Sequence, residues 1–254
     1  MHAHAQLLFL LAGFCFGDVL AATPIAVGGP DEPPTFTLLY EVENPQITLV
    51  AILGGEGRVG INETSTDTRN QTAQMLKNFS RRDFTNLRVN VVVFDSPVEL
   101  YPPAVRAGAE HLDRIVSVVR FYKSKFNVPV WLLGHSNGTI SVVEYLKKRQ
   151  ATMPVAGAVL SGSVYSIELD EGISIPLLFL HHEYDQCGNT PFSHARSHFE
   201  KAAKSNKAAT ELLTVKGGEA RGDPCRDGKH MYFGAYEEAA GQLAGFIGRN
   251  IQAQ

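Results

Sequence analysis

Residues 130–139 read Val-Trp-Leu-Leu-Gly-His-Ser-Asn-Gly-Thr and place Ser136 in a G-x-S-x-G motif between Gly134 and Gly138. The apolar run before the motif is typical of a buried strand, and residues 139–149 carry apolar side chains at helical spacing. The motif therefore predicts a strand, a sharp turn and a helix. Such a turn strains the serine backbone, and a Cβ at either glycine would clash with the strand or the helix. We expect Ser136 to stand clear of the sheet as a nucleophile; the alternative is a purely structural turn.

On both sides of this motif, short apolar runs alternate with stretches of helical period. The predicted strands cover residues 36–41, 46–53, 88–94, 128–133, 155–161, 176–181 and 210–215. This alternation predicts an α/β domain with a mainly parallel sheet and helices on both faces. We expect residues 22–34, which are rich in Pro and Gly, to be a leader, and residues 35–254 to form one domain.

The composition excludes several classes of protein. The chain has 254 residues, 44% of them hydrophobic and 19% charged, which fits one folded domain and neither a disordered nor a fibrous protein. Its formal net charge is −3 and it contains no Lys/Arg-rich run. Because most nucleic-acid affinity comes from attraction to phosphates, we expect no nucleic-acid partner.

The N-terminus resembles an export signal. Residues 7–16, LLFLLAGFCF, are too few to cross a hydrocarbon core of about 30 Å as a helix but have the length of a signal-peptide core. We therefore expect residues 1–21 to be cleaved, and the protein to be secreted or periplasmic with no stable membrane span. Two alternatives are a buried N-terminal helix and a lipid anchor at Cys15, which Phe14 disfavours. N-x-S/T triplets at Asn62, Asn70 and Asn78 would be glycosylated only in a source that glycosylates.

The cysteines favour one disulfide. Of the three in the chain, Cys15 would leave with the signal peptide, so Cys187 and Cys225 remain. In an oxidising compartment these two are expected to pair, the alternative being two separate buried thiols.

A serine hydroxyl needs a base to remove its proton and an acid to orient that base. Asp185 follows the strand predicted at 176–181, and His230 lies in a loop after the last strand, which is the order Ser, acid, His that accompanies this type of serine turn. We therefore predict Ser136, Asp185 and His230 as catalytic residues, with Glu183 as the alternative acid. His135 is expected to point away from the site. The predicted disulfide would connect the loops of the acid and the base.

The negative charge that develops during acyl transfer needs two backbone N–H donors. We assign them to Asn137, which follows the serine, and to Glu56 in the loop 54–57, Gly-Gly-Glu-Gly, with Gly55 as the alternative. A phosphate-binding loop is the competing interpretation, but the lysine of a P-loop is absent and a carboxylate stands where phosphate would bind.

These features resemble the α/β-hydrolase superfamily over residues 35–251. More narrowly, His-His-Glu-Tyr-Asp-Gln-Cys at 181–187, Thr190-Pro191 and Cys225 ahead of His230 are similar to a group of exported bacterial α/β-hydrolases. That group has glycine after the histidine, where this chain has Met231. The resemblance implies an eight-stranded, mostly parallel sheet and serine hydrolase chemistry with no metal or other cofactor.

Residues 162–175 are too few for a helical cap, so we expect an open site without a large cap domain; a lid formed by residues 60–72 is the alternative. An open site suits a small-molecule ester or an exposed polymer or peptide-like chain. The sequence thus favours a carboxylesterase-like enzyme over an amidase or peptidase, or over a non-catalytic binding protein of the same fold. A metal site would use four histidines, His181, His182, His194 and His198. The sequence has no H-E-x-x-H motif at these positions, so a zinc hydrolase is disfavoured.

Overall fold

The computed structural model describes residues 22–28, 33–66, 77 and 87–251. The predicted signal peptide with Cys15, the triplets at Asn70 and Asn78, and residues 67–72 of the alternative lid lie outside the described residues. Asn62 is described and exposed.

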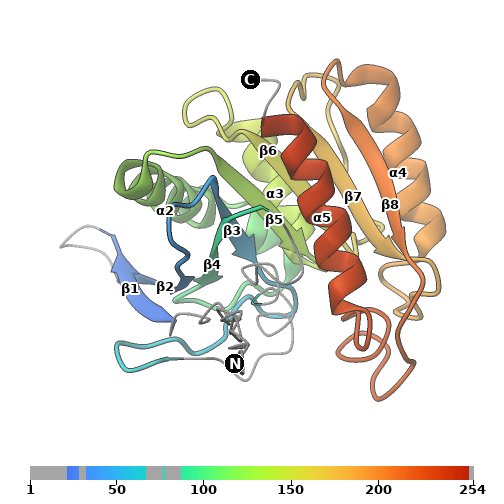
Figure 1. Ribbon diagram of the computed structural model, residues 1–254, viewed down its shortest axis with the longest axis horizontal. Coiled ribbons are helices and arrows are strands. Elements are labelled where there is room, and N and C mark those ends of the chain that lie inside the picture. Colours follow the sequence, from blue (N-terminus) through green and yellow to red (C-terminus); the bar gives the residue numbers. More distant parts are fainter. Residues whose placement is uncertain (1–21, 29–32, 67–76, 78–86, 252–254) are drawn as a thin grey trace, which may run out of the picture.

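Eight strands form one sheet in the order β1-β2-β4-β3-β5-β6-β7-β8 (Figure 1). Strand β2 runs antiparallel to both of its neighbours, β1 and β4, and the pairs from β4 to β8 are parallel. The strands are β1 (Thr23–Val27), β2 (Thr35–Tyr40), β3 (Ile47–Ile52), β4 (Val89–Asp95), β5 (Val130–His135), β6 (Gly157–Ser161), β7 (Leu177–His182) and β8 (Thr210–Val215).

All the predicted strands form, with ends that differ by two residues at most, but the sequence analysis missed β1. Thr23–Val27 lies in the stretch expected to be a leader, yet it pairs along its whole length with β2. The strand contains Pro24 and is half exposed, because it lies at the edge of the sheet and has a neighbour on one side only. The Pro and Gly content of residues 22–34 pointed to a leader, but the folded domain begins before Thr35.

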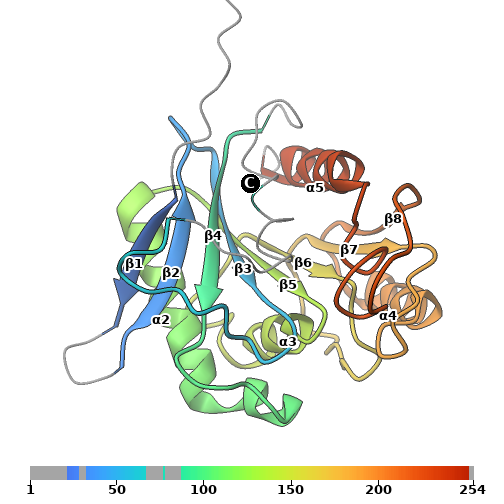
Figure 2. The same ribbon diagram turned by 90° about the horizontal axis from the view of Figure 1, so that it is seen from below.

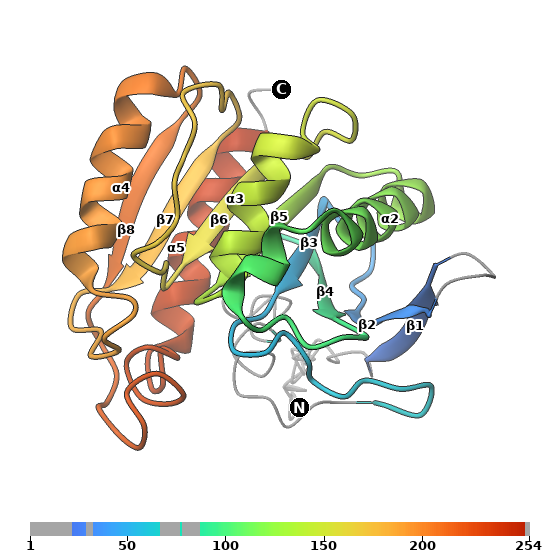
Figure 3. The same ribbon diagram turned by 180° about the vertical axis from the view of Figure 1, so that it is seen from behind.

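Helices cover both faces of the sheet, as Figures 2 and 3 show. One face carries α2 (Ala109–Phe126), α3 (Gly138–Lys148) and α4 (Phe192–Ser205), and the other carries α5 (Tyr236–Ile251). Strand residues alternate between the two faces: Leu49 and Ala51 pack in the core under α5, and Val50 and Ile52 pack in the core under α2 and α3.

No helix interrupts residues 162–176 between β6 and β7, all of which the structure describes. The prediction of a fold without a large cap is therefore confirmed. Within the described part of the chain, no helix is both long enough and apolar enough to span a membrane. Since the strands from β3 to β8 are parallel, the loops after β3, β5, β7 and β8 leave the sheet at one edge.

Candidate active site

Ser136 occupies the turn between β5 and α3 in a left-handed conformation, with φ of 55°. Its N–H donates to the carbonyl of Ser161 at 2.9 Å, which ties the turn to the neighbouring strand β6. A Cβ at Gly134 would collide with the backbone of Gly138, and one at Gly138 would collide with the carbonyl of Ile52. The two glycines are thus a steric requirement, and the turn has the geometry that the motif predicts.

Asp185 and His230 are joined by a hydrogen bond between the carboxylate Oδ2 and Nδ1, at 2.8 Å. Both side chains are almost fully buried. A carboxylate can only accept, so Nδ1 carries the proton and leaves Nε2 as the other functional nitrogen of the ring. Nε2 has no hydrogen-bond partner among the described residues.

Ser136 and His230 line one pocket at the carboxyl edge of the sheet, together with Gly54, Gly55 and Glu56. A Cβ built on Gly54 would lie 3.3 Å from the Ser136 Oγ, so the loop 54–57 lies directly against the serine. The structure therefore brings together the proposed nucleophile, base and oxyanion loop. No hydrogen bond joins Ser136 Oγ to His230 Nε2 among the described residues, and such contacts are often longer in the absence of substrate.

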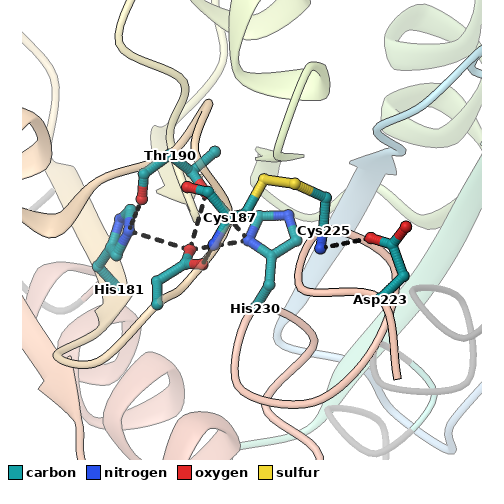
Figure 4. Close-up of a disulfide and its surroundings, with 7 residues drawn as sticks. His181, Cys187, Thr190, Asp223, Cys225 and His230 are labelled. Carbon is teal, nitrogen blue, oxygen red and sulfur yellow. Dashed lines mark hydrogen bonds and ion pairs between the residues drawn. A yellow bond between two sulfur atoms is a disulfide. The ribbon is translucent and has the colours of Figure 1, made fainter. Parts of the chain in front are cut away.

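The Asp185 carboxylate has further donors that the sequence analysis did not identify. Thr190 Oγ1 donates to Oδ2 at 2.9 Å, and the Cys187 N–H donates to Oδ1 at 2.9 Å. His181 Nε2 lies 3.3 Å from Oδ2 and 2.9 Å from the carbonyl of Thr190, which can only accept, so Nε2 of His181 carries a proton. Figure 4 shows His181 and His230 on opposite sides of this cluster.

These donors determine the charge state of the Asp185 carboxyl. Burial alone would raise the pKa of Asp185, but the hydrogen bonds from His181 and His230, the charge of His230 and the Cys187 amide outweigh burial and hold the pKa well below its usual value. Asp185 is therefore an ionised, rigidly held carboxylate at neutral pH.

Glu183, the alternative acid, is partly exposed and faces Lys216, with Oε2 and Nζ 3.7 Å apart. It has no hydrogen bond to His230. Of the two carboxylates, only Asp185 contacts the imidazole.

His135 does not point away from the site as expected. It is the last residue of β5 and lies opposite Ser161 of β6, and its Nδ1 is 3.0 Å from the Ser161 hydroxyl. This contact holds the ring beside His230, with the ring centroids 4.8 Å apart. Burial, and then the neighbouring His230, lower the pKa of His135 well below its usual value, so His135 places no positive charge beside the His230 ring.

The other histidines that the sequence singled out do not form one cluster. His182 is bonded to the carbonyl of Gly217 at 2.7 Å, on the opposite side of β7 from His181. His194 and His198 lie together on α4, where their ring centroids are 6.5 Å apart. The described residues contain no group of three or more His, Cys, Asp or Glu side chains that could hold a metal ion.

Cys187 and Cys225 form the predicted disulfide, which connects the loop of Asp185 to the loop of His230 (Figure 4). Cys187 also donates its N–H to Asp185, and Cys225 lines the pocket beside His230. Asp185 and His230 are therefore linked through the disulfide between their loops as well as through their hydrogen bond.

We expect the double substitution of Cys187 and Cys225 by serine to lower kcat/KM about 10- to 100-fold, the effect of misplacements near 1 Å. The free energy of unfolding should fall by up to about 4 kcal/mol, the chain-entropy value for a loop of this length. Hydrolysis of an ester, the substrate class that the sequence favours, and unfolding in urea measure the two effects. Unchanged kinetics and unchanged stability in the double variant would show that the disulfide has no role in holding the two loops.

The sequence matches no family model and no curated protein. The structure, however, is similar to many solved structures. A lidless α/β serine hydrolase of Xanthomonas campestris is 13% identical at a TM-score of 0.61, with 91% of this chain and 95% of that chain covered. An esterase of Pyrococcus furiosus is 12% identical (TM-score 0.62, 91% of each chain covered). A dienelactone hydrolase of Anabaena variabilis is also 12% identical (TM-score 0.63, 91% and 99% covered). The chain therefore has the α/β-hydrolase fold.

Proposed function

We propose that this protein is an exported serine hydrolase of the carboxylesterase type. The observation that carries the proposal is the orientation of His230: Asp185 holds Nδ1, while the ring lines the same pocket as Ser136. A nucleophile, a base and a buried acid in these positions form the arrangement that activates a serine for acyl transfer.

In the proposed reaction, Ser136 Oγ attacks the carbonyl carbon of the ester and its proton passes to Nε2 of His230. The N–H groups of Asn137 and of Glu56 or Gly55 donate to the oxygen that becomes negatively charged. When the tetrahedral species collapses, the alcohol leaves with the proton from His230, and an acyl group remains on Ser136. A water molecule then repeats the sequence, releases the carboxylic acid and restores the serine.

Asp185 stays ionised through both halves of the reaction. Its charge stabilises the imidazolium form of His230, and its contact with Nδ1 keeps Nε2 as the nitrogen that accepts the proton. Thr190 and His181 act behind it by fixing the carboxylate oxygen that His230 contacts.

The lack of a cap between β6 and β7 favours substrates that need no lid to bind, which are small soluble esters or exposed polymer or peptide-like chains. The similar structures include an esterase and a dienelactone hydrolase, which favours an ester over an amide as the bond that is cleaved. An amidase or peptidase would use the same three residues and would differ by cleaving an anilide as fast as the matching ester.

The proposal is tested with a short p-nitrophenyl ester. We expect a burst of p-nitrophenol from acylation. We also expect kcat/KM, measured from pH 5 to 9, to be lower on the acid side, because the base must be neutral to accept the proton of Ser136. The carboxyl of Asp185 adds no further step in this range, because its pKa is lowered. At pH values above its ordinary pKa near 4, a carboxyl whose pKa is lowered in the folded protein stabilises the folded state. That stabilisation is lost only as the pH falls through the lower pKa of the folded state.

A kcat/KM that stays flat from pH 5 to 9 would contradict the role of His230 as base. A protein that hydrolyses none of a panel of esters, lactones and anilides would instead be a non-catalytic binding protein with this fold.

A further inference from the structure

Arg106 is a fully buried arginine, with 0% exposure, in the short 3-10 helix η2 (Pro103–Ala107). Its Nη2 donates to the carbonyl of Gly55 at 3.1 Å and to that of Gly54 at 3.4 Å, and its Nη1 donates to Ser141 at 3.1 Å. The guanidinium thus lies directly behind the loop 54–57 that borders the pocket.

No carboxylate among the described residues forms an ion pair with Arg106, and its Nε has no hydrogen-bond partner there. Burial lowers the pKa of Arg106 to about 10, so the group is still positively charged at neutral pH. Burying a charge without a counter-ion destabilises a protein strongly. Among the described residues, the partners of this charge are the carbonyls of Gly54 and Gly55 and the hydroxyl of Ser141, which points to a role in the loop 54–57.

The two carbonyls that Arg106 binds belong to particular peptide groups. The Gly55 carbonyl shares its peptide with the Glu56 N–H, and the Gly54 carbonyl shares its peptide with the Gly55 N–H. Both peptides are trans, so each N–H points opposite to its carbonyl. With the carbonyls directed at the buried guanidinium, the N–H groups of Gly55 and Glu56 point the other way, and neither donates to a described residue.

The loop is built to let the guanidinium approach. Gly57 has φ of 76°, and a Cβ there would lie 3.2 Å from Arg106 Nη2 and 3.0 Å from Leu100 Cγ. On the far side of Gly57, the Asp95 carboxylate accepts from the N–H groups of Val59 and Ile61, at 2.6 Å each. Arg106 therefore holds the loop itself, and Asp95 holds the segment that follows it.

We propose that Arg106 is a positioning residue for the oxyanion hole, which polarises and orients the peptide groups of Gly55 and Glu56 so that their N–H groups stabilise the developing oxyanion. This inference rests on the proposed serine hydrolase function. A hydrogen bond to a carbonyl makes the N–H of the same peptide a stronger donor, and a buried positive charge on the far side adds to this effect. The negative charge on the carbonyl oxygen of the ester develops during the reaction. The two N–H groups therefore stabilise the transition state more than the bound ester.

The test compares Arg106→Met, Arg106→Lys and the control Arg114→Met. Arg114 is also a buried arginine, but it donates to the carbonyl of Pro33 and pairs with Glu110, with no contact to the loop. We expect Arg106→Met to lower kcat for a p-nitrophenyl ester about 10- to 100-fold with KM changed less than about threefold. Its affinity for an alkyl boronic acid, which forms a tetrahedral anion on serine, should fall by a similar factor. Arg114→Met should change neither quantity more than about twofold.

Thermal unfolding separates this role from a structural one. If Arg106→Met and Arg114→Met lose stability alike and both keep the wild-type kcat and boronate affinity, the inference is overturned while the proposed function stands. If Arg106→Met does not fold, Arg106→Lys decides, because an ammonium cannot replace the fork that reaches both carbonyls and Ser141. A wild-type kcat in Arg106→Lys overturns the inference, and a several-fold loss of kcat at unchanged KM supports it. If the wild type hydrolyses no ester and binds no boronate, the proposed function fails, and the inference fails with it.

Discussion

Replacement of Asp185 by asparagine is expected to lower kcat for ester hydrolysis by about four orders of magnitude, with KM nearly unchanged. The amide is almost the same size as the carboxylate, so the packing against Thr190 and Cys187 survives. It carries no charge to stabilise the imidazolium of His230, and its NH₂ group can donate to Nδ1 and so stabilise the wrong tautomer. Steady-state kinetics, with circular dichroism to verify folding, measure the effect.

Glu183→Gln is the matched control, because it makes the same chemical change two positions away on the same loop. Glu183 faces Lys216 at the surface, and we expect kcat to change less than about twofold. If Asp185→Asn kept more than a tenth of the wild-type kcat, or if Glu183→Gln showed the larger loss, Asp185 would not be the acid that orients His230.

Replacement of Ser136 by alanine is expected to lower kcat by about 10⁵- to 10⁶-fold and to abolish the burst of p-nitrophenol. The change removes the only atom that forms the acyl bond, and the hydroxyl leaves without disturbing the turn, because the Ser136 backbone makes the hydrogen bond to Ser161. Residual hydrolysis would come from substrate binding and the oxyanion donors alone.

Ser163→Ala provides the control for loss of a buried serine hydroxyl. Ser163 is buried just beyond β6, and its Oγ has no partner among the described residues. Its replacement should leave kcat and the burst unchanged. A Ser136→Ala variant that still produced a burst would place the nucleophile elsewhere.

The main features of the site could be predicted from sequence because each depends on local chemistry. The turn at Ser136 requires glycines where a Cβ would collide with backbone, and this requirement is visible in five consecutive residues. The chain order of Ser136, Asp185 and His230 follows from the positions of strand ends, and strands such as β5 and β7 are marked by apolar runs.

The missed features depend on contacts between distant segments or on pairing. Strand β1 pairs with the open edge of β2, and its β-branched residues are obscured in the sequence by Pro24 and by the Pro and Gly residues that follow. The orientation of His135 is determined by Ser161 on the neighbouring strand. Arg106 resembles any surface arginine in the sequence, and only the fold places it behind Gly54 and Gly55, some fifty positions earlier in the chain. The contacts of His181 and Thr190 with Asp185 likewise depend on how the chain turns after β7, and this turn cannot be predicted from sequence periodicity.

The most direct test of the proposed chemistry is covalent labelling with a fluorophosphonate, which reacts with activated serines, followed by mass spectrometric mapping of the modified peptide. We expect one adduct per wild-type chain, on Ser136 in the peptide that contains Gly134 and Gly138, and no adduct on folded Ser136→Ala. Labelling should also be much slower in Asp185→Asn. An unlabelled wild-type protein, or equal labelling of the wild type and Ser136→Ala, would contradict the assignment of Ser136 as the nucleophile.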